Sequence, residues 1–197
     1  MLSFSVCGVR ITVRFWFCMV ILWMLCAAGE AIIPCLCCSA LHECGHLLIC
    51  ARYRLRIRSL DLNALGLKLR LMQSQAMLSF GQSFWLHGGG IFMTLICGIV
   101  FAAVGLTEWM KVSFILTLFH LIPMREMDGG RMFADLGMWL FGAGAKALFV
   151  RVGQGIGCLI FAFFAAAAMW YGQNGLALML SLFAVCGVWP AGEDAIE

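Results

Sequence analysis

Long runs of apolar residues, separated by short polar segments, dominate the pattern of this 197-residue chain. An α-helix of about 20 apolar residues is long enough to cross the hydrocarbon core of a bilayer. The runs predict six membrane-spanning helices, although the fourth is short for a full crossing. Their expected bounds are 11–28, 31–50, 84–104, 112–124, 147–171 and 176–189. We therefore expect an all-α polytopic membrane protein that forms one domain over residues 1–197.

The segment between the second and third runs follows a different period. Charged and apolar side chains alternate from residue 52, and leucines continue the alternation to Leu71, with breaks at Asn63 and Gly66. A period of two is typical of β-strands, so the segment predicts a small β-hairpin at the cytosolic face. Its arginines could act as a topology signal that also meets anionic lipid. An exposed strand edge could also bind an extended substrate peptide, and the pattern is compatible with both interpretations.

The composition supports a membrane protein. The chain is 63% hydrophobic and 12% charged, with a mean hydropathy of +0.99, whereas a typical soluble domain is roughly 25% charged. A chain of this length does not offer enough interior to hide so much apolar surface, so a compact soluble fold is excluded. The net charge is only +3, and the basic segment lacks the interleaved aromatic residues of a nucleic-acid site. Most of the cysteines lie in apolar runs, where thiols act as small hydrophobic groups.

The positions of the positive charges predict the orientation in the membrane. Arginines and lysines concentrate before the first run, after the second, and between the fourth and fifth. These segments are cytosolic under the positive-inside rule if both termini are cytosolic. The opposite loops hold only Glu30, Glu108, Lys111 and Asn174.

One motif carries candidate chemistry. His42, Glu43 and His46 form H-E-x-x-H within the second apolar run. Residues four apart share one face of a helix, so both imidazoles can bind a single metal ion, and Glu43 can accept a proton from water. Alternatively, the histidines pack between helices and Glu43 is hydrogen-bonded to a neighbour. Because three ionisable groups at membrane depth are costly and usually mark function, the metal site is favoured.

A third protein ligand is expected after the short fourth run. Pro123 ends or kinks that run, and Gly129 and Gly130 allow a turn that other residues resist. Asp128, which lies between Pro123 and the two glycines, is the best candidate for the third ligand. Glu126 is a weaker competitor for the same role. Taken alone, Asp128 would instead be interpreted as a helix N-cap or a turn residue.

These motifs together resemble the site-2 protease family of intramembrane metalloproteases. The shared features are H-E-x-x-H on the second run and P-x-x-x-x-D-G-G after a short fourth run. The layout is most similar to the six-span bacterial subgroup typified by the sporulation protease SpoIVFB, and the match covers almost the whole chain. The family's Ala-Gly-Pro segment corresponds loosely to His87–Gly90. His120 stands where the family commonly has Asn.

The resemblance implies a zinc metalloendopeptidase that cleaves a peptide bond in or next to the membrane segment of a substrate. It implies one catalytic Zn²⁺ held by His42, His46 and Asp128, with Glu43 as general base and acid. His120 could contact the substrate or the transition state as that Asn does, or approach the metal itself. Alternatively, it is an interhelical histidine with its hydrogen bonds satisfied. We expect no CBS domain, because little of the chain follows the sixth run.

The resemblance also implies partners and a location. The protein would be a multi-pass protein of the bacterial cytoplasmic membrane, acting on a membrane protein or membrane-associated peptide. A membrane-tethered transcription factor or a sigma factor precursor fits that description, and a regulatory membrane protein is a further candidate partner. No nucleic acid is expected to bind. The sequence leaves the substrate and the oligomeric state open.

Two other functions are compatible with an intramembrane H-E-x-x-H motif. An inactive protease homologue would bind membrane clients without cutting them. A metal or proton transporter would instead carry ionisable residues at successive depths on several spans. In this chain the ionisable residues concentrate at one point, which favours the protease.

Overall fold

A computed structural model describes residues 2–6, 9–15, 18–19, 22, 29–63, 66–72, 77–178 and 180–181. The chain forms two compact units, Met1–Phe119 and His120–Glu197. The first unit holds a small sheet and the helices α2 (Ile32–Arg52), α3 (Phe80–Ala103) and most of α4 (Thr107–Leu121). A short 3-10 helix, η1 (Gly29–Ala31), precedes α2. The second unit holds α5 (Asp128–Phe141) and α6 (Ala145–Trp170).

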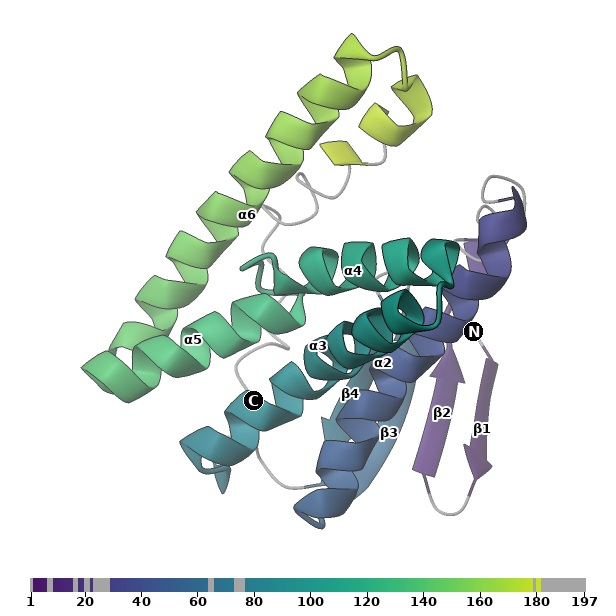
Figure 1. Ribbon diagram of the computed structural model, residues 1–197. Helices are drawn as coiled ribbons and strands as arrows, with labels where there is room; N and C mark the ends of the chain where they lie inside the picture. Colours follow the sequence, from purple (N-terminus) through teal and green to yellow (C-terminus); the bar gives the residue numbers. More distant parts are fainter. Residues whose placement is uncertain are drawn as a thin grey trace. The chain divides into compact units, whose positions relative to one another are not determined.

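Helices α2 and α3 lie side by side in the first unit (Figure 1). They approach closely because glycines face one another. A Cβ on Gly45 would overlap the carbonyl of Gly89 and lie 2.8 Å from Cβ of Met93, and a Cβ on Gly89 would lie 2.8 Å from the carbonyl oxygen of Gly45. Small residues at a crossing allow helix backbones to approach closely in a membrane protein. The start of α3 is fixed by Ser79, whose side chain accepts a hydrogen bond from Gln82 N–H in a capping box.

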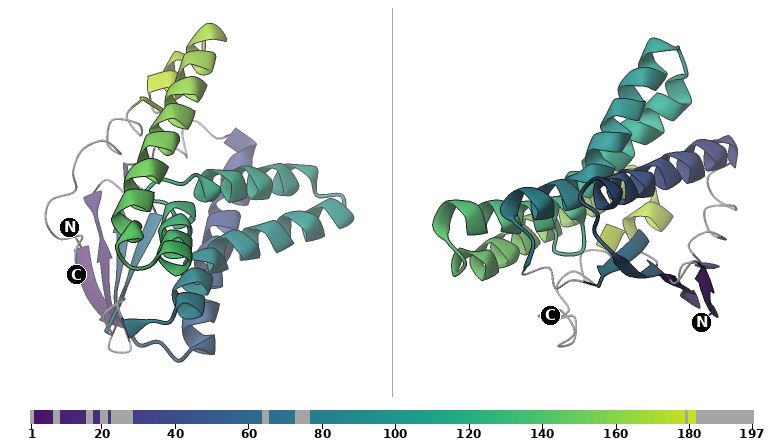
Figure 2. Two further views of the ribbon diagram at one scale, coloured as in Figure 1. Left: turned by 90° about the vertical axis from the view of Figure 1, so that its left-hand side faces the viewer. Right: turned by 90° about the horizontal axis from the view of Figure 1, so that it is seen from below.

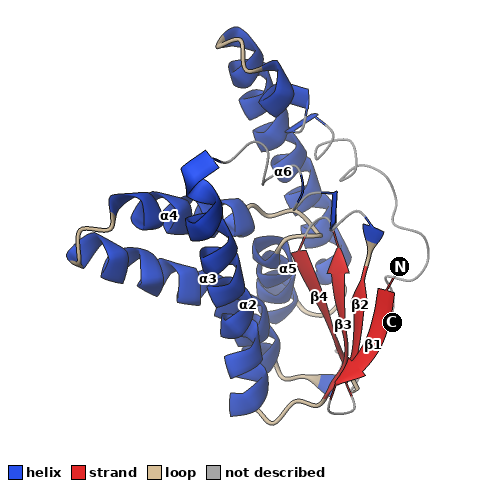
Figure 3. Ribbon diagram, turned by 90° about the vertical axis from the view of Figure 1, so that its right-hand side faces the viewer, coloured by secondary structure: helices blue, strands red, loops and turns tan. Residues whose placement is uncertain are grey.

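Four strands form one sheet in the order β1-β2-β3-β4 (Figure 3). The strands are β1 (Leu2–Val6), β2 (Val9–Val13), β3 (Ile57–Asn63) and β4 (Gly66–Leu71). Strands β1 and β2 form an antiparallel hairpin, as do β3 and β4, whereas β2 and β3 are parallel. The parallel connection is long and contains α2, as parallel pairing requires.

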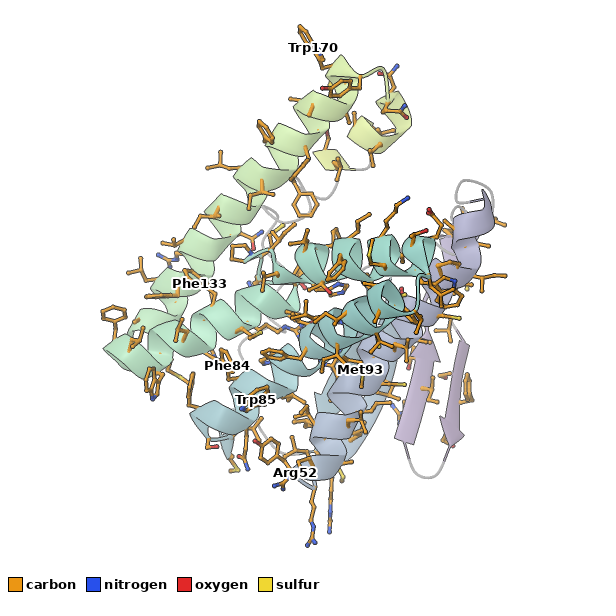
Figure 4. All side chains as sticks on the ribbon, viewed as in Figure 1. Arg52, Phe84, Trp85, Met93, Phe133 and Trp170 are labelled. Carbon is orange, nitrogen blue, oxygen red and sulfur yellow. The ribbon has the colours of Figure 1, made fainter. Side chains whose placement is uncertain are left out.

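The pairing gives the sheet one apolar and one polar face. On one face the pairs are Phe4 with Ile11, Ile11 with Leu60, and Leu60 with Leu69. Thr12 pairs with Asp61 on the other face, where Asp61 also forms a salt bridge of 3.1 Å with Arg70. At the end of α2, residues of β3 and β4 pack on a buried cluster of Cys50, Leu55 and Leu86. Arg52 points away from that end of the helix (Figure 4).

The second unit is a helical hairpin of α5 and α6 (Figures 1 and 2). Phe133 and Phe149 pack with their ring centroids 5.0 Å apart, and a Cβ on Gly137 would overlap the Phe149 ring. Gly142 has a φ of 85°, a left-handed conformation that favours glycine, and it ends α5.

The structure contains candidate membrane-spanning helices. Three helices in the described part of the chain are long and apolar enough to cross a membrane: Ile32–Arg52, Phe80–Ala103 and Ala145–Trp170. They correspond to the predicted spans 31–50, 84–104 and 147–171. The predicted span 112–124 overlaps α4, which has 15 residues and is shorter than the roughly 20 needed for a straight crossing.

The predicted all-α fold with a single hairpin is wrong at the N-terminus. Residues 11–13, assigned to the first span, belong to β2, and the sheet has four strands because β1 and β2 join the predicted hairpin. Both N-terminal strands alternate apolar and polar residues, but they are short, and they join the sheet because β2 pairs with β3, which is distant in sequence. The hairpin predicted after the second span is confirmed as β3 and β4. Most of residues 14–28 and all of residues 182–189 lie outside the described residues.

Helix α5 is a second departure from the expected fold, since no helix was predicted between the fourth and fifth runs. The helix contains Asp128, Arg131 and Asp135 among its 14 residues. A search for uniformly apolar runs does not detect a helix in which charged residues are interspersed with apolar ones.

Candidate metal centre

His42, Glu43 and His46 lie on α2. They precede Cys50, which belongs to the buried cluster on which β3 and β4 pack. The exposed fraction of His42 is only 2%. The Nε2 atoms of His42 and His46 are 3.2 Å apart, and their ring planes meet at 74°. The helix therefore points one nitrogen of each imidazole at a common position, as the spacing of four residues predicts.

A backbone carbonyl of α3 determines which ring nitrogen of neutral His46 carries the proton. Its Nδ1 lies 2.7 Å from the carbonyl oxygen of Leu86. A carbonyl can only accept, so Nδ1–H donates this hydrogen bond and the Nε2 atom of neutral His46 carries a lone pair. Metal-binding histidines are commonly held in this way, with the second ring nitrogen donating to a carbonyl or carboxylate.

The spacing of the two nitrogens fits a zinc ion. Zinc binds imidazole nitrogen at about 2.0–2.1 Å, so two such ligands at a tetrahedral angle lie about 3.3 Å apart. The observed separation of 3.2 Å between the Nε2 atoms agrees with this value. The pair is thus already arranged as two ligands of one tetrahedral ion.

Gly90 on α3 leaves the space beside the two nitrogens open. A Cβ at this position would overlap Nε2 of His42 and lie 2.5 Å from Nε2 of His46. Any side chain here would therefore fill the position toward which the imidazoles point. In the sequence, Gly90 is only part of a loose counterpart of the family's Ala-Gly-Pro segment. The steric role of Gly90 could not be predicted, because it depends on α2, which lies far away in sequence.

The second unit presents Asp128 as the first residue of α5. Met127 occupies the N-cap position, and no side chain caps this helix. The interpretation of Asp128 as an N-cap is therefore wrong, because the helix already includes it. Glu126, the competing candidate ligand, is exposed.

The two glycines after Asp128 serve close packing. Both are helical, and neither has a positive φ. A Cβ on Gly129 would overlap the carbonyl of Leu121, and one on Gly130 would overlap the carbonyl of Met124. The prediction that these glycines permit a special turn is wrong, since they allow the start of α5 to pack on the preceding backbone.

Helix α6 holds the loop that precedes Asp128. The side-chain oxygen of Gln154 accepts a hydrogen bond of 3.0 Å from the N–H of Arg125. A Cβ on Gly153 would overlap the carbonyl of Pro123, and a Cβ on Gly157 would overlap the side chain of Met124. One hydrogen bond and two glycine contacts thus hold the loop against α6. The role of Gln154 was not predicted, because a single glutamine in an apolar run gives no signal of its backbone partner.

The candidate ligands come from both units: His42 and His46 from α2 in the first, and Asp128 from the start of α5 in the second. Two imidazoles and a carboxylate suit Zn²⁺ and leave a coordination position for water or substrate. His120 lies in the last turn of α4.

Comparisons with known proteins identify a similar fold. No family model and no curated protein matches the sequence. Among solved structures, the site-2 protease from Methanocaldococcus jannaschii is similar, with a TM-score of 0.58 and 19% sequence identity. The similarity covers 94% of this chain and 92% of that protein. The chain therefore shares the fold of a site-2 protease over nearly its whole length.

We expect Gly90→Ala to weaken zinc binding. The added methyl group would overlap the position beside both imidazoles. Overpacking costs about 1–3 kcal/mol, so zinc affinity should fall about 10- to 100-fold. The measurement is competition with a chromophoric chelator in detergent. Gly81→Ala is the matched control, because a Cβ there meets nothing within 4 Å. Equal zinc affinity in the two variants would contradict the steric role of Gly90.

We expect Gln154→Met to destabilise the second unit. The change keeps the length of the side chain but removes the acceptor for Arg125 N–H, and an unsatisfied buried donor costs about 1–3 kcal/mol. Thermal unfolding of the whole chain in detergent measures this loss. Gln154→Glu keeps an acceptor oxygen and should restore part of the stability. An unchanged midpoint for Gln154→Met would show that the bond does not stabilise the loop.

Proposed function

We propose that the chain is an intramembrane zinc metalloprotease. The observation that carries the proposal is the His42–His46 pair on an apolar helix, with Nε2 atoms 3.2 Å apart and His46 Nδ1 bonded to the carbonyl of Leu86. A fold similar to that of a site-2 protease supports the same conclusion. The proposed reaction is hydrolysis of a peptide bond in or next to the membrane segment of a substrate.

In this proposal His42, His46 and Asp128 are the metal ligands and supply two neutral nitrogens and one carboxylate oxygen. A zinc ion held by these residues would supply Lewis-acid chemistry for the scissile carbonyl and the water. Glu43, next to His42 on the same helix, takes a proton from the water as its oxygen bonds to the carbonyl carbon. The C–N bond then breaks, and Glu43 passes that proton to the departing amine. His120 is proposed to contact the substrate or the transition state.

The bilayer defines the proposed substrate class. The helix that carries the motif is 21 residues long and apolar enough to cross a membrane. A site on such a helix is accessible to membrane-embedded peptides, and a membrane-tethered transcription factor or sigma factor precursor is the proposed kind of substrate. The sheet ends in the edge strands β1 and β4, and such an edge can bind an extended peptide by adding a strand.

The proposed topology follows from the charges. Six spans with both termini in the cytosol would place the basic segments on the inner side of a bacterial cytoplasmic membrane. The three apolar helices of the described residues support a membrane location.

We expect Glu43→Gln to retain zinc and lose cleavage, because the amide keeps the shape of the side chain but cannot accept the proton. General acid–base catalysis typically contributes about 10²–10⁴-fold, so cleavage should fall by at least 100-fold. The test uses a reporter with a single transmembrane segment between two soluble domains, co-expressed with each variant. Cleavage is read by gel and the cut position by mass spectrometry.

The control for this experiment is His42→Ala, which should lose both zinc and cleavage. Wild-type cleavage by Glu43→Gln would rule out the proposed mechanism. Zinc-free wild-type protein without cleavage would identify an inactive homologue, whereas zinc uptake into liposomes without cleavage would identify a transporter.

A further inference from the structure

Three buried hydroxyl groups lie between α3 and α4 in the first unit, and we refer to Thr94, Ser113 and Thr117 as the hydroxyl chain. The exposed fractions of Thr94 and Ser113 are 0%, and that of Thr117 is 6%. A hydroxyl group buried in an apolar setting is unfavourable unless it is hydrogen-bonded. Each of the three is bonded, so the chain is a fully satisfied polar contact within an apolar protein.

The bonds run from α4 to α3. Thr117 Oγ1 donates to Thr94 Oγ1 at 2.8 Å, and Ser113 Oγ donates to the carbonyl of Thr94 at 3.1 Å. Thr94 Oγ1 in turn lies 3.1 Å from the carbonyl oxygen of Gly90 and 3.0 Å from that of Ile91. Thr117 Oγ1 is also 2.8 Å from the carbonyl oxygen of Ser113 within α4. Thr94 of α3 therefore bonds to both Ser113 and Thr117, and its hydroxyl bonds to the backbone of its own helix at Gly90 and Ile91.

Thr94 shares one stripe of α3 with two contacts of the histidine pair. Leu86, Gly90 and Thr94 are spaced by four residues, so they lie on the same side of the helix. Leu86 supplies the carbonyl that accepts from His46 Nδ1. Gly90 presents its bare Cα to both Nε2 atoms. An axial shift or rotation of α3 would thus change all three contacts together.

Apolar contacts alone fix such a position poorly, because burial of apolar surface is not directional. Hydrogen bonds between helices have defined lengths and angles, and they act as specific contacts in membrane proteins. The hydroxyl chain is a directional contact between α3 and α4, and it lies one turn away from Gly90.

We propose that Thr94 is a positioning residue for the metal centre: anchored by Ser113 and Thr117, it holds the Leu86–Gly90 turn of α3 in register with His42 and His46. The inference rests on the zinc site of the proposed function. Part of the zinc affinity then depends on Ser113 and Thr117 of α4, although neither residue binds the metal.

The test is Thr94→Val, which preserves the shape of the side chain and removes the hydroxyl. Partners of metal ligands typically change metal affinity by about 10- to 100-fold, and we expect the lower value, about tenfold, because Thr94 acts through Gly90. Zinc affinity is measured on full-length protein by chelator competition. The absorption spectrum of the Co²⁺-loaded protein reports ligand geometry and should shift in this variant. Thr94→Ser keeps the hydroxyl and should restore both values.

Two further variants separate positioning from general stability. Thr117→Val removes the donor to Thr94 and should change zinc affinity in the same direction by a smaller factor. Because both residues act in one chain, the double variant should bind zinc about as weakly as Thr94→Val alone. Thr107→Val, at an exposed position at the start of α4, is the matched control and should bind zinc as the wild type does.

The outcomes distinguish this inference from the proposed function. Wild-type zinc affinity and an unchanged Co²⁺ spectrum in folded Thr94→Val, even with a lower melting temperature, would overturn the positioning role and leave the protease proposal intact. If Thr94→Val does not fold, unchanged affinity in Thr117→Val would overturn it equally. A wild-type protein that binds no zinc would overturn both.

Discussion

The close approach of α2 and α3 at Gly45 and Gly89 is the contact on which the candidate metal centre depends. A Cβ on either glycine would collide with the opposite helix, so only this pair of residues allows the backbones to come so near. That distance is what brings the carbonyl of Leu86 within 2.7 Å of His46 Nδ1. A wider crossing would leave His46 without this acceptor and would remove Gly90 from the histidine pair.

The same contact explains how an apolar helix tolerates polar side chains. The carbonyl of Leu86 already accepts a bond within α3, and it has a second lone pair available for His46. The helix backbone can therefore satisfy one imidazole nitrogen without an additional polar side chain. The hydroxyl chain satisfies its own groups in a similar way, by donating to carbonyl oxygens of Gly90, Ile91 and Thr94. Main-chain oxygens thus accept hydrogen bonds from both His46 and the hydroxyl chain.

The features predicted from the sequence are those that depend on local spacing. Two histidines four residues apart share a helix face, and alternation predicts the hairpin of β3 and β4. The features that were missed depend on distant partners. Strand β2 pairs with β3, Gly90 faces residues of α2, and Gly129 packs on the carbonyl of Leu121. Glycine carries no side chain whose type could indicate its partner, so its role emerges only once the packing is known.

The fold and the candidate metal centre place different demands on the sequence, and glycine packing explains the difference. A similar fold at 19% identity requires only that helices of suitable length cross at suitable places, which many apolar residues allow. The candidate site needs particular residues: glycines at 45, 89 and 90 around the histidines, and at 129, 130 and 153 around the loop of Asp128. Exposed apolar positions such as Leu118 and Leu159 meet no such requirement. Substitutions should therefore be tolerated on those surfaces and restricted at these glycines, even though the glycines themselves bind nothing.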